Sequence, residues 1–122
     1  MKFTGGNSGV KRRWRYYKTE GGRRPAWEFL DKLSDDDAGS VLAAMGEVED
    51  KGTRAARHLK GDLWEVRADG DNAAYRVIFA EEGTKGRILL ALEVFSKKTQ
   101  KTPPRVIKRA EKRLKQWRKE AD

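Results

Sequence analysis

The chain of 122 residues contains no cysteine and a single histidine, His58. The missing cysteines exclude disulfides, thiol catalysis and cysteine-ligated zinc or iron–sulfur sites. One histidine also excludes a multi-histidine metal site. We therefore expect neither a metal nor a cofactor.

Long apolar runs are missing as well. No run exceeds the five residues of Ile88–Leu92, which is far shorter than the roughly 20 residues that cross a bilayer as a helix. Met1–Gly9 also lacks the apolar stretch of a signal peptide. We expect a cytoplasmic protein with no membrane partner. Because the chain starts with small polar residues and is short, residues 1–12 are expected to be a flexible leader before a single domain over 13–122.

Positive charge is what the chain has in excess. It carries 28 Lys and Arg against 19 Asp and Glu, which gives a net charge of +9. Residues 96–122 alone hold 11 basic and 3 acidic residues. This distribution favours a polyanionic partner, with nucleic acid first. The alternative is a solvated helix whose lysines keep the protein soluble.

Hydrophobic spacing divides the chain into helices and strands. Helical spacing predicts helices from Pro25 to near Ser34, from Ser34 with its acidic first turn to Gly52, and from Thr102 onward. Alternation predicts strands over Arg13–Lys18, Leu63–Arg67, Ala74–Ala80 and Arg87–Phe95. Short connections containing glycine imply antiparallel neighbours. The fold class is therefore α+β: an antiparallel sheet of about four strands, an N-terminal helix hairpin on one face and a basic C-terminal helix.

Strand alternation gathers charged side chains on one sheet face. If Trp64 and Val66 point to the helices, then Glu65 and Arg67 point away from them. On the next strand Arg76 shares that second face. We therefore predict an open face on which Arg67 and Arg76 converge.

The first strand combines aromatic and basic residues. Trp14, Tyr16 and Tyr17 lie among arginines and lysines. Two interpretations stay open: the rings stack on bases, as in binders of single-stranded RNA, or they are core and edge residues of the strand.

Three blocks carry a resemblance to a known family: His58–Arg67 (HLKGDLWEVR), Tyr75–Phe79 (YRVIF) and Phe95–Pro103 (FSKKTQKTP), followed by a helix with Ala110. They resemble the RelE/HigB superfamily of toxins, in particular its phage Gp49-like, HigB-type branch. The resemblance covers most of residues 13–118. It implies a RelE-like fold and the toxin of a type II toxin–antitoxin pair.

The activity that the resemblance implies is a metal-independent endoribonuclease. Such an mRNA interferase cuts messenger RNA, usually on the ribosome, and so inhibits translation. The implied partners are mRNA, the ribosome and a cognate antitoxin, typically a helix-turn-helix protein.

Attack of a ribose 2′-hydroxyl on the adjacent phosphate requires alignment, stabilisation of extra negative charge and proton transfer. Arginine suits the second task because its charged donor fork matches phosphate oxygens. The resemblance maps the family's clamp position onto Arg76 and its basic positions onto Arg67, Lys98 and Lys60. We predict Arg67, Arg76, Lys98 and Glu65 as catalytic residues and Lys60, Lys97, Lys101 and Arg105 as RNA-binding residues.

The groups that move protons stay open. Many relatives carry Tyr or His near the start of the last helix, where this chain reads Thr102–Arg105, so no general acid is assigned. The proton acceptor is Glu65, His58, a lysine of depressed pKa or water. The alternative for Glu65 is a surface ion pair with Arg67.

Two other functional classes also fit the residues. A ParE-like branch of the superfamily is thought to act on DNA gyrase, so this fold also suits a basic toxin or binding module without nuclease chemistry. An inactive relative that only binds its antitoxin is the third possibility.

Overall fold

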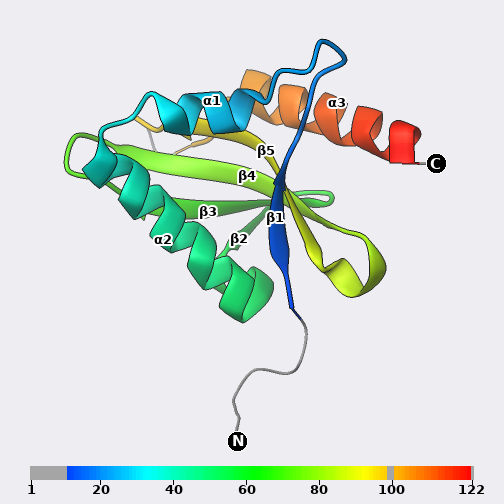
Figure 1. Cartoon of the computed structure of the whole chain (residues 1–122), viewed down its shortest axis with the longest axis horizontal. Helices are drawn as coiled ribbons and strands as arrows, with labels where there is room; N and C mark the ends of the chain where they lie inside the picture. Colours follow the sequence, from blue (N-terminus) through cyan, green and yellow to red (C-terminus); the bar gives the residue numbers. More distant parts are fainter. Residues whose placement is uncertain (1–10, 99–100, 122) are drawn as a thin grey trace, which may run out of the picture.

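The computed structural model describes residues 11–98 and 101–121, which form an α+β domain with helices on both faces of one mixed sheet (Figure 1). The strands are β1 (Arg13–Tyr16), β2 (Arg57–Lys60), β3 (Leu63–Asp69), β4 (Ala74–Glu82) and β5 (Ile88–Ser96). The helices are α1 (Pro25–Asp31), α2 (Asp35–Lys51) and α3 (Pro104–Ala121), and two short 3₁₀ turns are η1 (Gly52–Ala55) and η2 (Thr84–Gly86). The expected leader lies outside the described residues, apart from Lys11 and Arg12.

The sheet has five strands in the order β1-β5-β4-β3-β2. Strands β2 to β5 are antiparallel neighbours, whereas β1 runs parallel to β5, with Arg13 opposite Ile88. The expectation of about four antiparallel strands was therefore wrong on two points. Strand β2 was missed because Leu59 is its one apolar residue, which leaves no alternation to detect. The direction of β1 was missed because no short turn connects it to β5.

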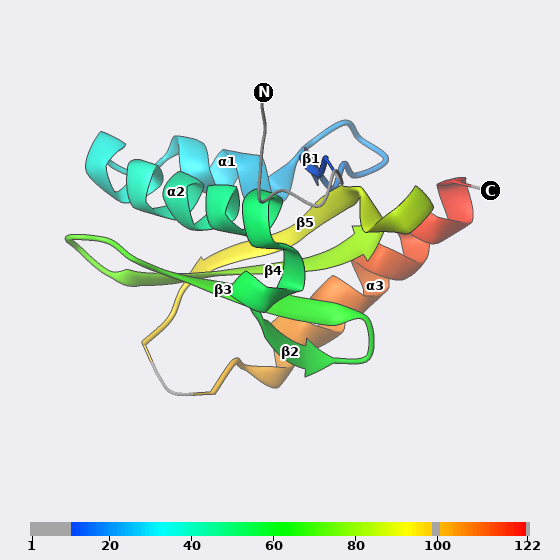
Figure 2. The same cartoon turned by 90° about the horizontal axis from the view of Figure 1, so that it is seen from below.

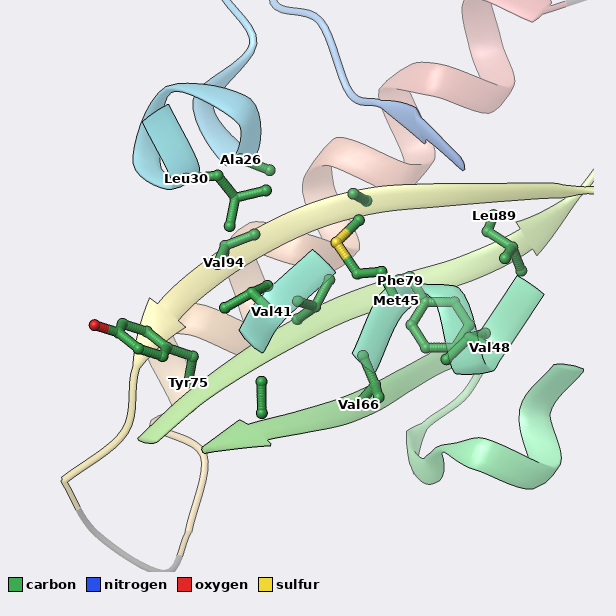
Figure 3. Packing of buried hydrophobic residues seen from close by; sticks show 13 residues of the cluster. Ala26, Leu30, Val41, Met45, Val48, Val66, Tyr75, Phe79, Leu89 and Val94 are labelled. Carbon is green, nitrogen blue, oxygen red and sulfur yellow. The ribbon is translucent and has the colours of Figure 1, made fainter. Parts of the chain in front are cut away.

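Helices α1 and α2 lie on one face of the sheet, where α1 packs on β5 and α2 on β3 (Figure 2). The α2 stripe of Val41, Met45 and Val48 recurs at helical spacing and is fully buried against Phe79 and its neighbours (Figure 3). Each helix contacts its strand more than it contacts the other helix. The pair is therefore looser than the hairpin we expected.

Helix α3 covers the opposite face of the sheet (Figure 2). Its buried residues Val106, Ala110 and Leu114 pack on an apolar set from the strands. That set is Leu63, Ile78, Ala80, Leu90 and Leu92. The expectation of an open second face was wrong, because an apolar stripe on α3 and an apolar strand face must bury each other.

Several basic residues of α3 hold the helix to the sheet. Arg109 donates two hydrogen bonds of 2.8 Å to the buried Glu93 carboxylate of β5, and Arg113 pairs with the same group. Arg118 pairs with Glu82 at 2.8 Å. Part of the positive charge at the end of the chain therefore stabilises the fold. Within the described residues no helix combines the length and apolarity needed to cross a membrane.

A buried carboxylate ties the β3–β4 turn to α2. Ser34 caps α2 by accepting a hydrogen bond from the Asp37 N–H. The Asp37 carboxylate accepts bonds from the Asp71 N–H at 2.8 Å and the Tyr75 hydroxyl at 2.5 Å. The turn thus gains a fixed position over the first turn of the helix.

Gly70 passes close to this carboxylate, and we expect a Gly70→Ala variant to be destabilised by about 1–3 kcal/mol. An added Cβ would lie 2.7 Å from the carboxyl carbon of Asp37 and 2.9 Å from the Tyr75 ring. Urea denaturation measures the effect. Gly39→Ala in α2 is the matched control, because its Cβ meets nothing within 4 Å and should leave stability equal or slightly raised. Equal unfolding midpoints for the two variants would contradict the close approach.

Candidate functional site

A buried carboxylate surrounded by cations lies on the α3 face, at the end of the sheet where α3 begins. Glu65 of β3 is 3% exposed. Its Oε1 lies 2.9 Å from Arg57 Nη2, 3.3 Å from Arg76 Nε and 3.8 Å from Lys97 Nζ. The hydroxyl of Thr102 donates a hydrogen bond to Oε2. We call these five residues the Glu65 cluster.

Strand register brings the cluster together. Glu65 pairs directly with Arg57 on β2, and Arg76 lies opposite Arg67 across the β3–β4 pair. Residues two apart on a strand share a face, so these side chains point the same way. The backbone N–H of Lys97 donates to Ala74 at 2.8 Å, which keeps the chain after β5 beside β4. Three strands and the segment after a fourth therefore supply the cluster.

The negative charge of the Glu65 carboxylate is stabilised by neighbouring cationic side chains rather than by water. A buried ionised group is costly unless it is paired, and here several cationic groups face it. Arg76 is itself 9% exposed, and its Nη1 donates to the Tyr75 carbonyl at 3.2 Å. Both ends of the Arg76 guanidinium contact the protein, so its orientation is fixed.

Lys97 is the unusual member of the cluster. Among the buried side-chain nitrogen and oxygen atoms of the described residues, its Nζ is the one without a hydrogen-bond partner. Burial lowers the pKa of the Lys97 ammonium, the guanidinium of Arg76 lowers it further, and Glu65 opposes both effects. The cluster thus holds an amine whose neutral form is favoured more than in an ordinary lysine.

A pocket of about 350 Å³ adjoins the cluster between the end of β5 and the start of α3. Its lining residues are Phe95, Ser96, Lys97, Lys98, Pro103, Arg105, Val106 and Arg109. The charged residues of this lining are all basic. Such a pocket suits an anion the size of a phosphate group.

The structure brings Arg67 and Arg76 to one face, as predicted, but their environments differ. The Arg67 side chain is exposed and its Nε lies 3.1 Å from Asp69. Arg76 is buried because Glu65 holds it, so the expectation that both lie open was wrong. The alternative surface pair between Glu65 and Arg67 was also wrong: Glu65 is buried and pairs within the cluster.

Two residues of the sequence analysis lie apart from the cluster. Lys60, at the end of β2, is exposed and pairs with Glu111 at 3.5 Å. His58 lies opposite Trp64, its ring contacts the Trp64 ring at 5.2 Å between centroids, and its Nε2 is 2.7 Å from the Gly61 carbonyl oxygen. Since Trp64 packs on the face that α2 covers, His58 points away from the Glu65 cluster.

The predicted RNA-binding residues Lys101 and Arg105 and the predicted catalytic residue Lys98 lie around the start of α3, whereas the predicted RNA-binding residue Lys97 is buried in the Glu65 cluster. Lys98 and Arg105 are exposed and line the pocket, and Lys101 is exposed before the helix. The sequence analysis missed Arg57 and the role of Thr102. Arg57 belongs to the strand without alternation, and no local pattern signals that the Thr102 hydroxyl becomes buried.

Comparisons with known proteins show the family of the chain. Residues 28–115 match the family described as "Phage derived protein Gp49-like (DUF891)". The chain is 31% identical over 109 residues to "Probable endoribonuclease HigB1" of Mycobacterium tuberculosis, in strains CDC 1551 / Oshkosh and ATCC 25618 / H37Rv. This match covers 87% of the chain and 85% of the relative. The family match includes every residue of the Glu65 cluster. The chain therefore belongs to the Gp49-like, HigB-type family that the sequence blocks resemble.

Proposed function

We propose that this protein is the toxin of a type II toxin–antitoxin pair and that it cuts mRNA on the ribosome in the cytoplasm. The observation that carries the proposal is the convergence of cationic side chains around Glu65, beside a pocket whose charged lining is basic. The name of the HigB1 relative supports the same activity. The proposed partners are mRNA, the ribosome and a cognate antitoxin.

The proposed reaction is internal transfer at a phosphodiester. The ribose 2′-hydroxyl gives up its proton as its oxygen attacks phosphorus, the bond to the 5′-oxygen breaks, and the departing 5′-oxygen takes a proton from water. The products are a 2′,3′-cyclic phosphate and a 5′-hydroxyl. Negative charge grows on the phosphate oxygens as the bond forms, so positioned guanidinium groups stabilise that state. Arg67 is exposed and able to contact the phosphate directly. Arg76, held on two sides, supplies a fixed charge behind it.

We assign Glu65 a positioning role rather than that of a base. Both of its oxygens are engaged by cluster residues and the side chain is buried. A buried carboxylate whose two oxygens already accept hydrogen bonds is poorly placed to take a proton from a bound ribose. Its proposed task is to fix the guanidinium groups of Arg57 and Arg76.

Lys97 is the proton acceptor in our proposal. Lys97 is one of the residues that line the pocket. Its side chain is buried beside Glu65, and its Nζ has no hydrogen bond to give up in turning toward bound RNA. Burial and Arg76 lower its pKa, so a larger fraction of neutral amine is present near neutral pH than in an exposed lysine. Of the other side chains considered from the sequence, Glu65 is engaged within the cluster and His58 is on the opposite face.

The pH profile of cleavage tests this role. A neutral amine accepts the proton, so the rate should rise with pH until Lys97 is deprotonated. In a Lys97→Arg variant the side chain stays charged, so the rise should vanish and the rate near neutral pH should fall about 10²-fold. Lys98→Arg is the control and should keep the rise. If the pH profile of cleavage by Lys97→Arg equals that of the wild type, another group is the base.

Transcript ends test the function as a whole. After induction of the protein, we expect growth arrest and new 5′ ends within messenger RNA. Growth arrest with an unchanged map of 5′ ends would contradict the nuclease and favour a basic toxin without RNA cleavage. Normal growth would indicate an inactive relative.

A further inference from the structure

A second basic pocket lies at the other end of α3, where this helix meets β1. Its volume is about 640 Å³. The lining residues are Trp14, Arg15, Tyr16, Lys18, Gly22, Arg24 and Trp117. The lining therefore combines three aromatic rings with three cationic side chains and contains no carboxylate. The proposed reaction uses none of these residues.

The edge position of β1 creates this pocket. Strand β1 pairs with β5 alone and is the outermost strand of the sheet. Arg15 points to the α3 face, where its guanidinium lies 5.7 Å from the Trp117 ring centroid. Trp14 and Tyr16 point to the other face, and the Trp14 indole N–H donates to the Met45 carbonyl at 2.8 Å. The pocket thus wraps the open edge of β1.

The structure supports the core-and-edge interpretation of the first-strand aromatics, and stacking on bases stays a prediction. Tyr17 is buried beneath α3 and donates a hydrogen bond to Gln116, so it is a core residue. Trp14 and Tyr16 are half-buried and also line the pocket. Their exposed portions remain available to a ligand.

The lining matches one ligand chemistry. Flat rings stack on bases of any sequence, and neighbouring guanidinium and ammonium groups bind the connecting phosphates. The volume falls in the range of small-ligand sites, which is sufficient for a nucleotide. An adjacent hollow that shares Lys18 and Trp117 also contains Glu20 and Glu120, which repel an anion. The phosphates therefore belong in the larger pocket rather than in this hollow.

We propose that this pocket binds a nucleotide of single-stranded RNA, with the base against the aromatic rings and phosphates on Arg15, Lys18 and Arg24. The choice of RNA rests on the proposed function. Trp117 follows Pro104 by 13 positions of α3, which is about 20 Å along a helix. The pocket would hold the RNA at a distance from the cleaved bond and would raise affinity without taking part in chemistry.

Binding of an uncleavable RNA tests the pocket separately from cleavage. The probe is a fluorescent 2′-O-methylated oligouridine, which lacks the attacking hydroxyl, and anisotropy gives its Kd. A Lys18→Gln/Arg24→Gln variant should bind about tenfold more weakly, and its salt dependence should decrease by about 1.4 in log–log slope. The control Lys32→Gln/Arg54→Gln has the same net charge, and neither residue lines the pocket. It should bind as the wild type does.

The outcomes distinguish failure of the nucleotide site from failure of the proposed nuclease function. Equal affinities of the pocket variant and the control would overturn the nucleotide site, and so would binding of polyglutamate by the wild type as tightly as the RNA. Cleavage of unmodified RNA at saturating concentration is measured in parallel. If the pocket variant binds weakly but cleaves at the wild-type rate once saturated, the pocket is a binding site as proposed. If no variant or wild-type protein cleaves while binding follows the expected pattern, the nuclease assignment fails and the pocket remains.

Discussion

An Arg76→Ala variant is expected to fold and to lose RNA cleavage, with the rate falling about 10²- to 10³-fold. Arg76 is held by Glu65 and by the Tyr75 carbonyl, so its charge is already oriented when RNA arrives. In the proposed reaction, its removal deletes a preorganised group that would stabilise the extra negative charge of the reacting phosphate. Primer extension on a defined RNA with purified protein measures the rate, and growth after induction measures toxicity.

Two further variants make the Arg76 result interpretable. Arg76→Lys keeps a positive charge but loses the donor fork, so cleavage should be intermediate. Arg54→Ala removes an exposed arginine of η1 outside the cluster and should cleave at the wild-type rate. Circular dichroism and thermal unfolding verify that each variant is folded, because Glu65 retains Arg57 and Lys97 as partners. Full toxicity in folded Arg76→Ala would show that the protein acts by another route.

An Asp37→Asn variant should lose about 3 kcal/mol of stability. The Asp37 carboxylate is buried and accepts hydrogen bonds from two backbone N–H groups and from the Tyr75 hydroxyl. An amide of similar shape directs its own N–H groups at some of these donors, which leaves buried polar groups unpaired. Urea denaturation at neutral pH measures the loss. Asp36→Asn is the control, because Asp36 lies in the same first turn but is exposed. This variant loses only a favourable charge at the helix N-terminus, so it should lose less than about 1 kcal/mol of stability.

The same carboxylate gives the fold an acid-sensitive contact. The Tyr75 hydroxyl and the turn N–H groups lower the pKa of Asp37 below its ordinary value, although burial opposes them. A depressed folded-state pKa contributes stability above the unfolded value, and this contribution is lost as pH falls through the folded value. The stability difference between wild type and Asp37→Asn should therefore shrink in acid. A difference that stays constant down to strongly acidic pH would contradict this linkage.

The sequence predicted the elements better than their assembly. The Ser34 cap with its acidic first turn, the proline at the start of α1 and the alternation of β3, β4 and β5 are local signals, and the structure confirms those elements. To predict that the apolar stripe of α3 is buried, one must know which face of the sheet still lacks a packing partner. That information lies in the summed apolar residues of several strands rather than in any one segment.

The candidate site shows the same limit. Alternation correctly placed Glu65, Arg67 and Arg76 on one face. It did not show that Glu65 becomes buried, because that depends on Arg57 from an unrecognised strand and on Thr102 from beyond β5. The exposure of a charged side chain is decided by its neighbours in space, so the burial of Glu65 and Lys97 became visible only with the structure.

The pairing of β1 with β5 has a consequence for the order in which the chain becomes functional during synthesis. Residues 13–16 gain a strand neighbour only after residues 88–91 have been synthesised. Pairings between residues so distant in sequence slow folding. Thr102, which completes the Glu65 cluster, is made later still. Because domains fold as units as the chain emerges, a nascent chain lacks an assembled cluster until most of its own message has been translated.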